Sequence, residues 1–124
     1  MGLLARLKGV RTARQQAGDA AEDRALHYLA AQGMRLVERN FRCRGGEIDL
    51  IMQSGETLIF VEVRQRTGDS HGDAAASITP RKQARILLAA QIFLQRYREP
   101  PPCRIDVISI DGARLQWLRN AIQA

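Results

Sequence analysis

The stretch GGEIDLIMQSGETLIFVEVRQR, residues 45–66, predicts a β-hairpin whose strands carry unexpected charges. Two runs rich in Ile, Leu, Val and Phe stand on either side of a short polar turn, as in paired strands. The carboxylates Glu47, Asp49 and Glu62 interrupt these runs. Arg64 follows them two residues after the last acid. Because opposed like charges destabilise a sheet, a hairpin that served only stability would not hold them, and these residues are candidates for a functional site.

The turn decides which carboxylates meet across the hairpin. If residues 55–56 form a two-residue loop, with Gly first as a type II′ turn prefers, Asp49 lies opposite Glu62. If residues 54–55 form the loop, the pairing slides and Glu47 faces Glu62 instead. Side chains alternate between the faces of a strand, so the acids of both strands point to one side in either register. Only a β-bulge would break this rule.

Two interpretations of this acidic face follow. Facing carboxylates repel, and Mg²⁺ or Mn²⁺ would remove the repulsion because both ions prefer carboxylate oxygens. The alternative is a solvated face on which Glu47 and Arg64 form a cross-strand ion pair. The second strand is apolar on both faces, through Leu58 and Phe60 on one and Ile59 and Val61 on the other. A strand of this kind is typical of a doubly covered sheet, which favours the metal site.

The first helix adds a further acid. Its predicted range is Ala17 to Gln32. At 100° per residue, Glu22 falls on the apolar stripe of Ala25, Leu26 and Leu29. A charge on a buried stripe is costly unless it has a partner. Glu22 therefore either points at the hairpin acids or faces water near the helix start, where an acid suits the helix dipole.

The remaining segments predict an α/β fold with a central mixed β-sheet flanked by helices, in a single domain from residue 17 to residue 124. In chain order they are a strand at 34–41, the hairpin, a polar loop at 65–77, a helix from Thr79-Pro80 to Tyr97, and strands at 104–110 and 114–118 joined by the Asp111-Gly112 turn. Residues 1–16 carry four basic and no acidic side chains. They predict either a nucleic-acid-binding arm or a frayed terminus.

Composition narrows the classes of partner and location. The 124 residues carry a formal net charge of +6, which favours anionic partners such as nucleic acid. Two cysteines, Cys43 and Cys103, are too few for a disulfide scaffold and lack zinc-site spacing. No apolar stretch approaches the ~18 residues that span a bilayer, and the start does not resemble a secretory signal. The sequence therefore predicts a cytoplasmic protein without a membrane partner.

The placed motifs resemble a known superfamily. A helix glutamate, then GEIDL, then FVEVR is similar to the PD-(D/E)XK nucleases, the restriction-endonuclease-like fold in its Holliday-junction-resolvase-like form. More closely, GGEIDLI, FVEVRQR, KQARILLAAQIFL and CRIDVISI resemble the YraN family of bacterial proteins. The resemblance implies a Mg²⁺- or Mn²⁺-dependent enzyme that cleaves DNA, including branched or damaged DNA. It implies that Glu22, Asp49 and Glu62 bind the metal and that they form the catalytic site together with Arg64.

Arg64 is the main departure from the superfamily pattern, which usually has Lys there. Lys can help position water and stabilise negative charge, whereas Arg does only the second because its pKa stays above ~12. Glu47, Gln65 and Lys82 are additional candidates for the site. Lys82, in the first turn of the second helix, reaches the acids or a phosphate, or else lies in solvent.

Basic residues near the hairpin predict a DNA-binding surface. The predicted phosphate contacts are Arg66, Arg81, Lys82 and Arg85. His71, in the loop after the hairpin, is a candidate acid-base group or an uninvolved residue. Asp106 is predicted to be structural and to pair with Arg104. The alternative function is a non-catalytic DNA-binding or protein-interaction module on the same fold, and a homodimer remains open.

Overall fold

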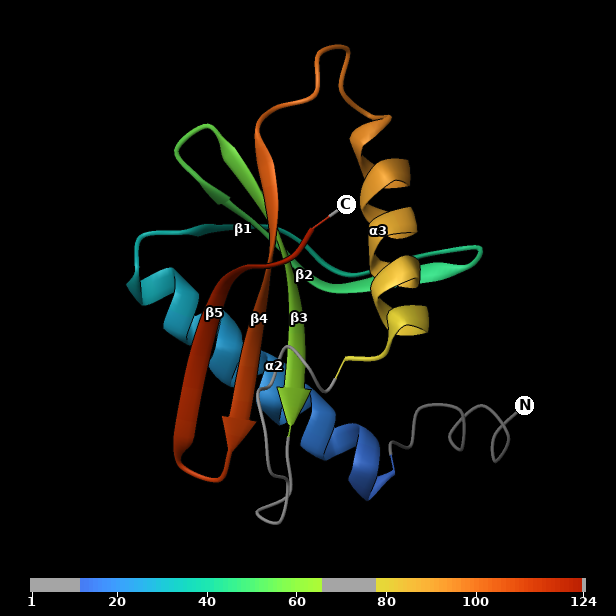
Figure 1. The fold of residues 1–124 in the computed structure, drawn as a ribbon. Helices are drawn as coiled ribbons and strands as arrows, with labels where there is room; N and C mark the ends of the chain where they lie inside the picture. Colours follow the sequence, from blue (N-terminus) through green and yellow to red (C-terminus); the bar gives the residue numbers. More distant parts are fainter. Residues whose placement is uncertain (1–11, 66–77, 124) are drawn as a thin grey trace, which may run out of the picture.

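The computed structural model of the protein describes residues 12–65 and 78–123. Within these ranges five strands form one sheet in the order β1-β2-β3-β4-β5, in which only β3 and β4 run parallel (Figure 1). The elements are α2 (Ala13–Ala31), β1 (Arg35–Cys43), β2 (Gly46–Ser54), β3 (Thr57–Gln65), α3 (Pro80–Leu94), β4 (Cys103–Asp111) and β5 (Arg114–Ile122). The predicted single-domain α/β fold with a mixed sheet is confirmed.

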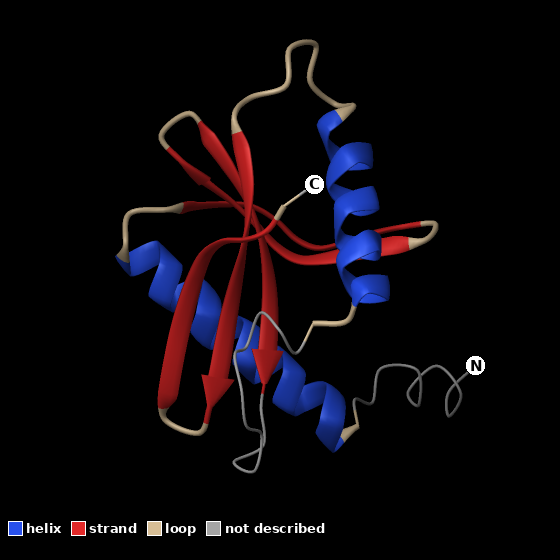
Figure 2. Ribbon diagram, in the orientation of Figure 1, coloured by secondary structure: helices blue, strands red, loops and turns tan. Residues whose placement is uncertain are grey.

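The two helices cover opposite faces of the sheet (Figure 2). Strand β3 separates two apolar clusters: Leu58 and Phe60 pack with α3, whereas Ile59 and Val61 pack with α2. All four side chains are fully buried. Burial of each side chain contributes about 1.5–3 kcal/mol to the stability of the folded state. Strand β3 is therefore the centre of the fold, as its two-sided apolar pattern predicts.

Helix α2 begins earlier than the sequence predicts. Thr12 and Gln15 form a capping box, in which the Thr12 hydroxyl accepts from the Gln15 amide at 3.1 Å. The Gln15 side chain accepts from the Thr12 amide at 2.8 Å in return. These bonds satisfy free amides of the first turn, so residues 13–16 belong to the helix and not to the predicted arm. Residues 1–11 lie outside the described residues.

Helix α3 starts as predicted and ends early. The Thr79 hydroxyl accepts from the Lys82 amide at 3.1 Å, and Pro80 takes the first helical position. At the other end, the amides of residues 95–97 bond to carbonyls three residues back. This tighter 3₁₀-type turn ends the α-helix at Leu94 and not at Tyr97.

The β2–β3 hairpin adopts the first of the two predicted registers. Ser54 pairs with Thr57, so residues 55–56 form the loop, and Gly55 has a φ of +59°. The ladder then runs only as far as the Leu50–Val61 pair. The predicted direct strand pairing of Asp49 with Glu62 is therefore absent from the ladder, although the register is the one that would align them.

Strand β5 extends beyond its predicted end because a buried acid holds its last part. Asp106 is fully buried and accepts from Arg104 Nε at 3.0 Å, as its predicted pairing requires. It also accepts from Trp117 Nε1 at 2.9 Å and from the Asn120 amide at 2.8 Å. Asn120 has a φ of +51°. The carboxylate thus ties β4 to an irregular stretch of β5.

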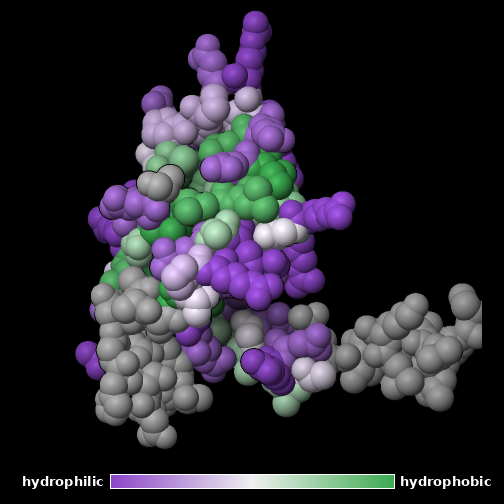
Figure 3. Space-filling view, turned by 45° about the vertical axis from the view of Figure 1, so that its right-hand side comes forward, coloured by the Kyte–Doolittle hydropathy of each residue, from purple (hydrophilic) through white to green (hydrophobic). Residues whose placement is uncertain are grey.

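The surface carries an apolar patch bordered by hydrophilic side chains (Figure 3). A mainly apolar groove of about 240 Å³ lies between α3 and strands β4 and β5, with Leu87, Leu94 and Ile122 among its lining residues. None of the hairpin carboxylates lines it. Of the helices that the structure describes, neither is both long and apolar enough to cross a membrane.

Candidate functional site

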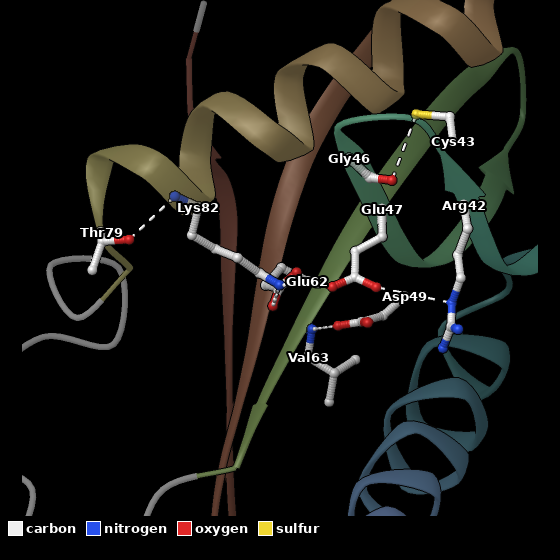
Figure 4. A network of polar contacts seen from close by, with 9 residues as sticks. All are labelled: Arg42, Cys43, Gly46, Glu47, Asp49, Glu62, Val63, Thr79 and Lys82. Carbon is white, nitrogen blue, oxygen red and sulfur yellow. Dashed lines mark hydrogen bonds and ion pairs between the residues drawn. The ribbon is translucent and has the colours of Figure 1, made fainter.

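The hairpin carboxylates gather where β2 and β3 stop pairing (Figure 4). Asp49 Oδ2 accepts a hydrogen bond from the Val63 amide at 2.8 Å. The Asp49 carboxylate thus replaces the backbone carbonyl of β2 that would accept from this amide in a continuous ladder. Asp49 is thereby fixed against the same part of β3 that carries Glu62.

Glu62 is a buried acid with one unsatisfied oxygen. Its side chain is only 5% exposed, and its Oε1 lies 3.6 Å from the Lys82 ammonium. Its Oε2 is buried and makes no hydrogen bond of normal geometry among the described residues, although the Glu62 side chain lies close enough to lower the pKa of Asp49. Leaving such an atom unpaired costs about 1–3 kcal/mol or more for a charged group. The arrangement therefore favours either a proton or a cation at this oxygen.

Burial and crowding shift the protonation of both acids. Burial, followed by the charge of Asp49, raises the pKa of Glu62 to about 8, and the Lys82 ammonium opposes this rise. Burial also raises the pKa of Asp49, and the hydrogen bond from Val63 opposes it. These shifts favour a proton shared by Asp49 and Glu62 near neutral pH, and a cation that bound there would displace it.

Lys82 contacts two of the hairpin acids. Its Nζ lies 3.4 Å from Glu47 Oε1 and 3.6 Å from Glu62 Oε1, and its side chain is partly buried. Glu47 has a second, looser partner in Arg42, at 3.9 Å. The Glu47–Arg64 ion pair of the alternative, solvated-face interpretation is not observed, because β2 and β3 have already separated there. Lys82 also stabilises the charged form of Glu62 more than Arg64 does, as reflected in the pKa of Glu62.

A close contact at Gly46 sets the distance between α3 and β2. A Cβ atom at this position would lie 2.2 Å from the Arg85 carbonyl oxygen and 3.2 Å from the Ala89 amide. Real Cβ atoms do not approach a carbonyl this closely, so the helix backbone can rest here only on glycine. This contact holds the first turns of α3, with Lys82, over the start of β2, with Glu47.

Glu22 approaches the site from the other face of the sheet. Its Oε1 lies 3.3 Å from Arg39 Nε, and its side chain is mostly buried. Burial and the charge of Asp49 raise the pKa of Glu22, whereas its bond to Arg39 lowers it. Glu22 thus comes within electrostatic range of the hairpin acids, one of the two orientations that the sequence leaves open.

Arg39 and Asn40 on β1 were not predicted from the sequence. The Arg39 guanidinium bonds Glu22, Asp23 at 2.6 Å and the Asp19 carbonyl at 3.3 Å, which ties α2 to the sheet. Asn40 has a φ of +54° within the strand, and its side chain lowers the pKa of Glu22. The left-handed φ of Asn40, a non-glycine residue, is the sole local sign that this part of β1 is special. This angle is seen in the structure and cannot be read from the sequence.

Replacing Arg39 tests how firmly Glu22 is held. We expect Arg39→Leu to lower the free energy of unfolding by about 1–2 kcal/mol, because it leaves a mostly buried carboxylate without its cation. Urea denaturation at pH 7 measures the change. The control is Arg35→Leu, an exposed position at the start of the same strand, with an expected change within about 0.5 kcal/mol. An equal loss of unfolding free energy in both variants would show that Arg39 contributes no more than an exposed surface arginine.

The other predicted site residues lie farther out. Gln65 is exposed at the end of β3, Arg81 is exposed on α3, and Arg85 is half-buried there. The predicted contacts of Arg66 and His71 fall outside the described residues.

The donor chemistry of the site fits Mg²⁺ or Mn²⁺. Asp49 and Glu62 supply carboxylate oxygens, one of them buried without a partner, and such oxygens are the preferred ligands of both ions. As the side chains stand, no group of three or more His, Cys, Asp or Glu residues in the described ranges is arranged to hold an ion. The Lys82 ammonium meanwhile neutralises part of the acidic charge.

Comparison with known proteins places the chain in a family. The model of the "Uncharacterised protein family UPF0102" matches residues 21–110. The chain belongs to this family. UPF0102 is the YraN family, so the resemblance predicted from the motifs is confirmed. The match covers the second half of α2, with Glu22, together with β1, the hairpin, α3 and nearly all of β4, and therefore includes the residues of the candidate site that the structure describes.

Relatives in UPF0102 are similar over nearly their whole length. A UPF0102 protein of Herminiimonas arsenicoxydans is 62% identical over 118 residues, covering 95% of each chain. One from Janthinobacterium sp. (strain Marseille) is 61% identical, covering 92% of this chain and 93% of the relative. One from Alkalilimnicola ehrlichii is 54% identical, covering 88% of each. These relatives establish the family. The chemistry has to be inferred from the side chains of the site.

Proposed function

We propose that this UPF0102 protein is a metal-dependent endonuclease that acts on DNA phosphodiesters, including branched or damaged DNA. The observation that carries the proposal is Glu62, a buried carboxylate with an unpaired oxygen beside Asp49 and Lys82. A buried acid cluster of this kind is expensive for a fold and is typical of functional sites.

The side chains have distinct roles in the proposed site. Asp49 and Glu62 would hold Mg²⁺ or Mn²⁺, and Glu22 would add negative charge from the α2 side. The bound ion would supply a polarised, activated water and would stabilise charge on the phosphate. The Val63 amide orients Asp49, and Arg39 holds Glu22. Arg64 would stabilise negative charge without acting as a base.

The basic charge of the chain supports DNA as the substrate. A net charge of +6 favours a polyanion, and Arg66, Arg81, Lys82 and Arg85 would contact phosphates next to the acids. Such contacts release counterions, so DNA binding should weaken steeply with salt. A cytoplasmic location and a homodimer, which paired cuts would favour, remain predictions.

A non-catalytic DNA-binding or protein-interaction module is the second candidate function. Two observations favour it: Arg64 stands where the superfamily usually has Lys, and Lys82 already neutralises Glu47 and part of Glu62. Such a module would bind DNA in a salt-sensitive manner at the same affinity with and without Mn²⁺, and it would not cut.

A cleavage assay separates the two functions. We expect the wild-type protein to cleave four-way-junction or nicked DNA with Mn²⁺ and not with EDTA. The variants Asp49→Asn and Glu62→Gln keep the shape of the side chains and should lower the rate roughly 10²–10³-fold or more. Arg98→Gln, an exposed change outside the site, should keep the wild-type rate. Metal-dependent cleavage that survives both acidic-residue substitutions would sink the assignment.

A further inference from the structure

We propose that Lys82 is the charge-stabilising lysine of this site and performs, from helix α3, the role that the superfamily pattern gives to the strand position of Arg64. The inference rests on the proposed function and names one of its catalytic groups. It concerns the residue that would face the scissile phosphate beside the metal-binding acids.

Lys82 occupies a position that a solvated lysine would not take. It lies one turn before Ile86 on the stripe of α3 that also holds Ala89 and Phe93, and these three apolar side chains are buried. A lysine on a buried stripe has to reach a charged partner. Its ammonium reaches two, Glu47 at 3.4 Å and Glu62 at 3.6 Å.

The backbone that carries Lys82 is held at both sides. Its own amide donates to the Thr79 hydroxyl at 3.1 Å, within the helix cap. The next turn of α3 rests on Gly46, where a Cβ atom would lie 2.2 Å from the Arg85 carbonyl. The helix backbone is therefore held in a position that keeps the Lys82 ammonium beside Glu47 and Glu62.

Arg64 is less suited to this role. It lies two residues beyond Glu62 along β3 and pairs with Ser109 of β4. Lys82, in contrast, makes direct ion pairs with Glu47 at 3.4 Å and with Glu62 at 3.6 Å. A lysine ammonium is also a compact point charge with three donors, whereas the guanidinium is a broad planar fork. The cation that the hairpin motif lacks is thus supplied by the facing helix.

The experiment moves the lysine from the helix to the strand. Four proteins are compared with the wild type: Lys82→Met, Arg64→Met, the double variant Lys82→Met/Arg64→Lys, and the distant control Arg98→Met. We expect Lys82→Met to lower Mn²⁺-dependent cleavage about 100-fold and Arg64→Met by about tenfold or less. The double variant should recover at least tenfold over Lys82→Met. If Lys82 only stabilised α3, a lysine at position 64 would not restore cleavage.

Calorimetry with MnCl₂ gives a second readout that needs no cleavage. Removing the Lys82 ammonium removes a positive charge that competes with the ion for Glu47 and Glu62, so Mn²⁺ should bind about tenfold more tightly to Lys82→Met. Far-UV circular dichroism confirms that each variant is folded before either measurement.

The outcomes are distinct. Cleavage by Lys82→Met within threefold of the wild type, or no recovery in the double variant, would overturn the inference while leaving the nuclease proposal intact. If the wild-type protein cleaves nothing, the proposed function fails and the catalytic role of Lys82 fails with it. Equal Mn²⁺ affinity in Lys82→Met and the wild type would show that Lys82 does not lie beside the bound ion, and would also overturn the inference.

Discussion

Gly46→Val is expected to destabilise the domain by about 3 kcal/mol or more, which is a large part of the 5–15 kcal/mol typical of a small protein. The added Cβ atom would lie 2.2 Å from the Arg85 carbonyl oxygen and 3.2 Å from the Ala89 amide. Both are backbone atoms in the middle of α3, so neither can move without shifting the helix. Urea denaturation at pH 7 measures the loss.

A matched control separates this clash from the general cost of replacing glycine. Gly55→Ala introduces a side chain at a φ of +59° with no atom within 4 Å of the new Cβ, so only backbone strain of about 1 kcal/mol is expected. Gly46→Val with wild-type stability would show that α3 does not rest on β2. The milder Gly46→Ala should also change Mn²⁺ affinity, because it displaces Lys82 from Glu47.

The sequence leaves two hairpin registers open, and the structure adopts the one with residues 55–56 as the loop. The sequence contains no signal that pairing stops after Leu50. In the structure Ile48 packs on the α3 side and Leu50 on the α2 side, so strict alternation fails at Asp49. Asp49 then bonds the Val63 amide with its side chain, a contact that depends on tertiary structure.

The same limit explains why the position of Lys82 stayed open. Helical periodicity places it on the stripe of Ile86, but whether it reaches the acids depends on the distance between α3 and β2. That distance is set by Gly46 against the Arg85 carbonyl, a contact between segments far apart in the chain. Arg39 was missed for a similar reason, because its partner Glu22 belongs to a helix that the strand pattern does not position.

The separation of β2 and β3 has a consequence for the site. Each helix carries one charged residue on its buried side, Glu22 on α2 and Lys82 on α3. A continuous sheet would keep these two charges apart, because the helices cover opposite faces. Where the ladder ends, both can approach Asp49 and Glu62. The break in the β2–β3 ladder therefore lets charged side chains from both helices approach the same pair of acids.

The stability of the metal-free wild-type protein is expected to fall by about 3 kcal/mol as the pH rises from about 5 to 8. Burial raises the pKa of Glu62 from 4.5 to about 8 in the folded state. Between these values the folded state binds a proton that the unfolded state has released. This stabilising contribution is complete below pH 4.5 and is lost as the pH rises through 8. Asp49, whose pKa is also raised, changes stability in the same direction.

Glu62→Gln should remove most of this pH dependence, because the amide keeps the shape of the side chain and never ionises. Urea denaturation with EDTA at pH 5, 6.5 and 8 measures it, and Glu56→Gln, an exposed change in the hairpin loop, should keep the wild-type slope. Saturating Mn²⁺ should reverse the slope in the wild type and in Glu56→Gln but not in Glu62→Gln, because the ion binds the deprotonated acids and adds about 2.7 kcal/mol at 100 times its Kd. A flat profile in metal-free wild type would mean that Glu62 is ionised and satisfied, and the case for a cation at its unpaired oxygen would fail.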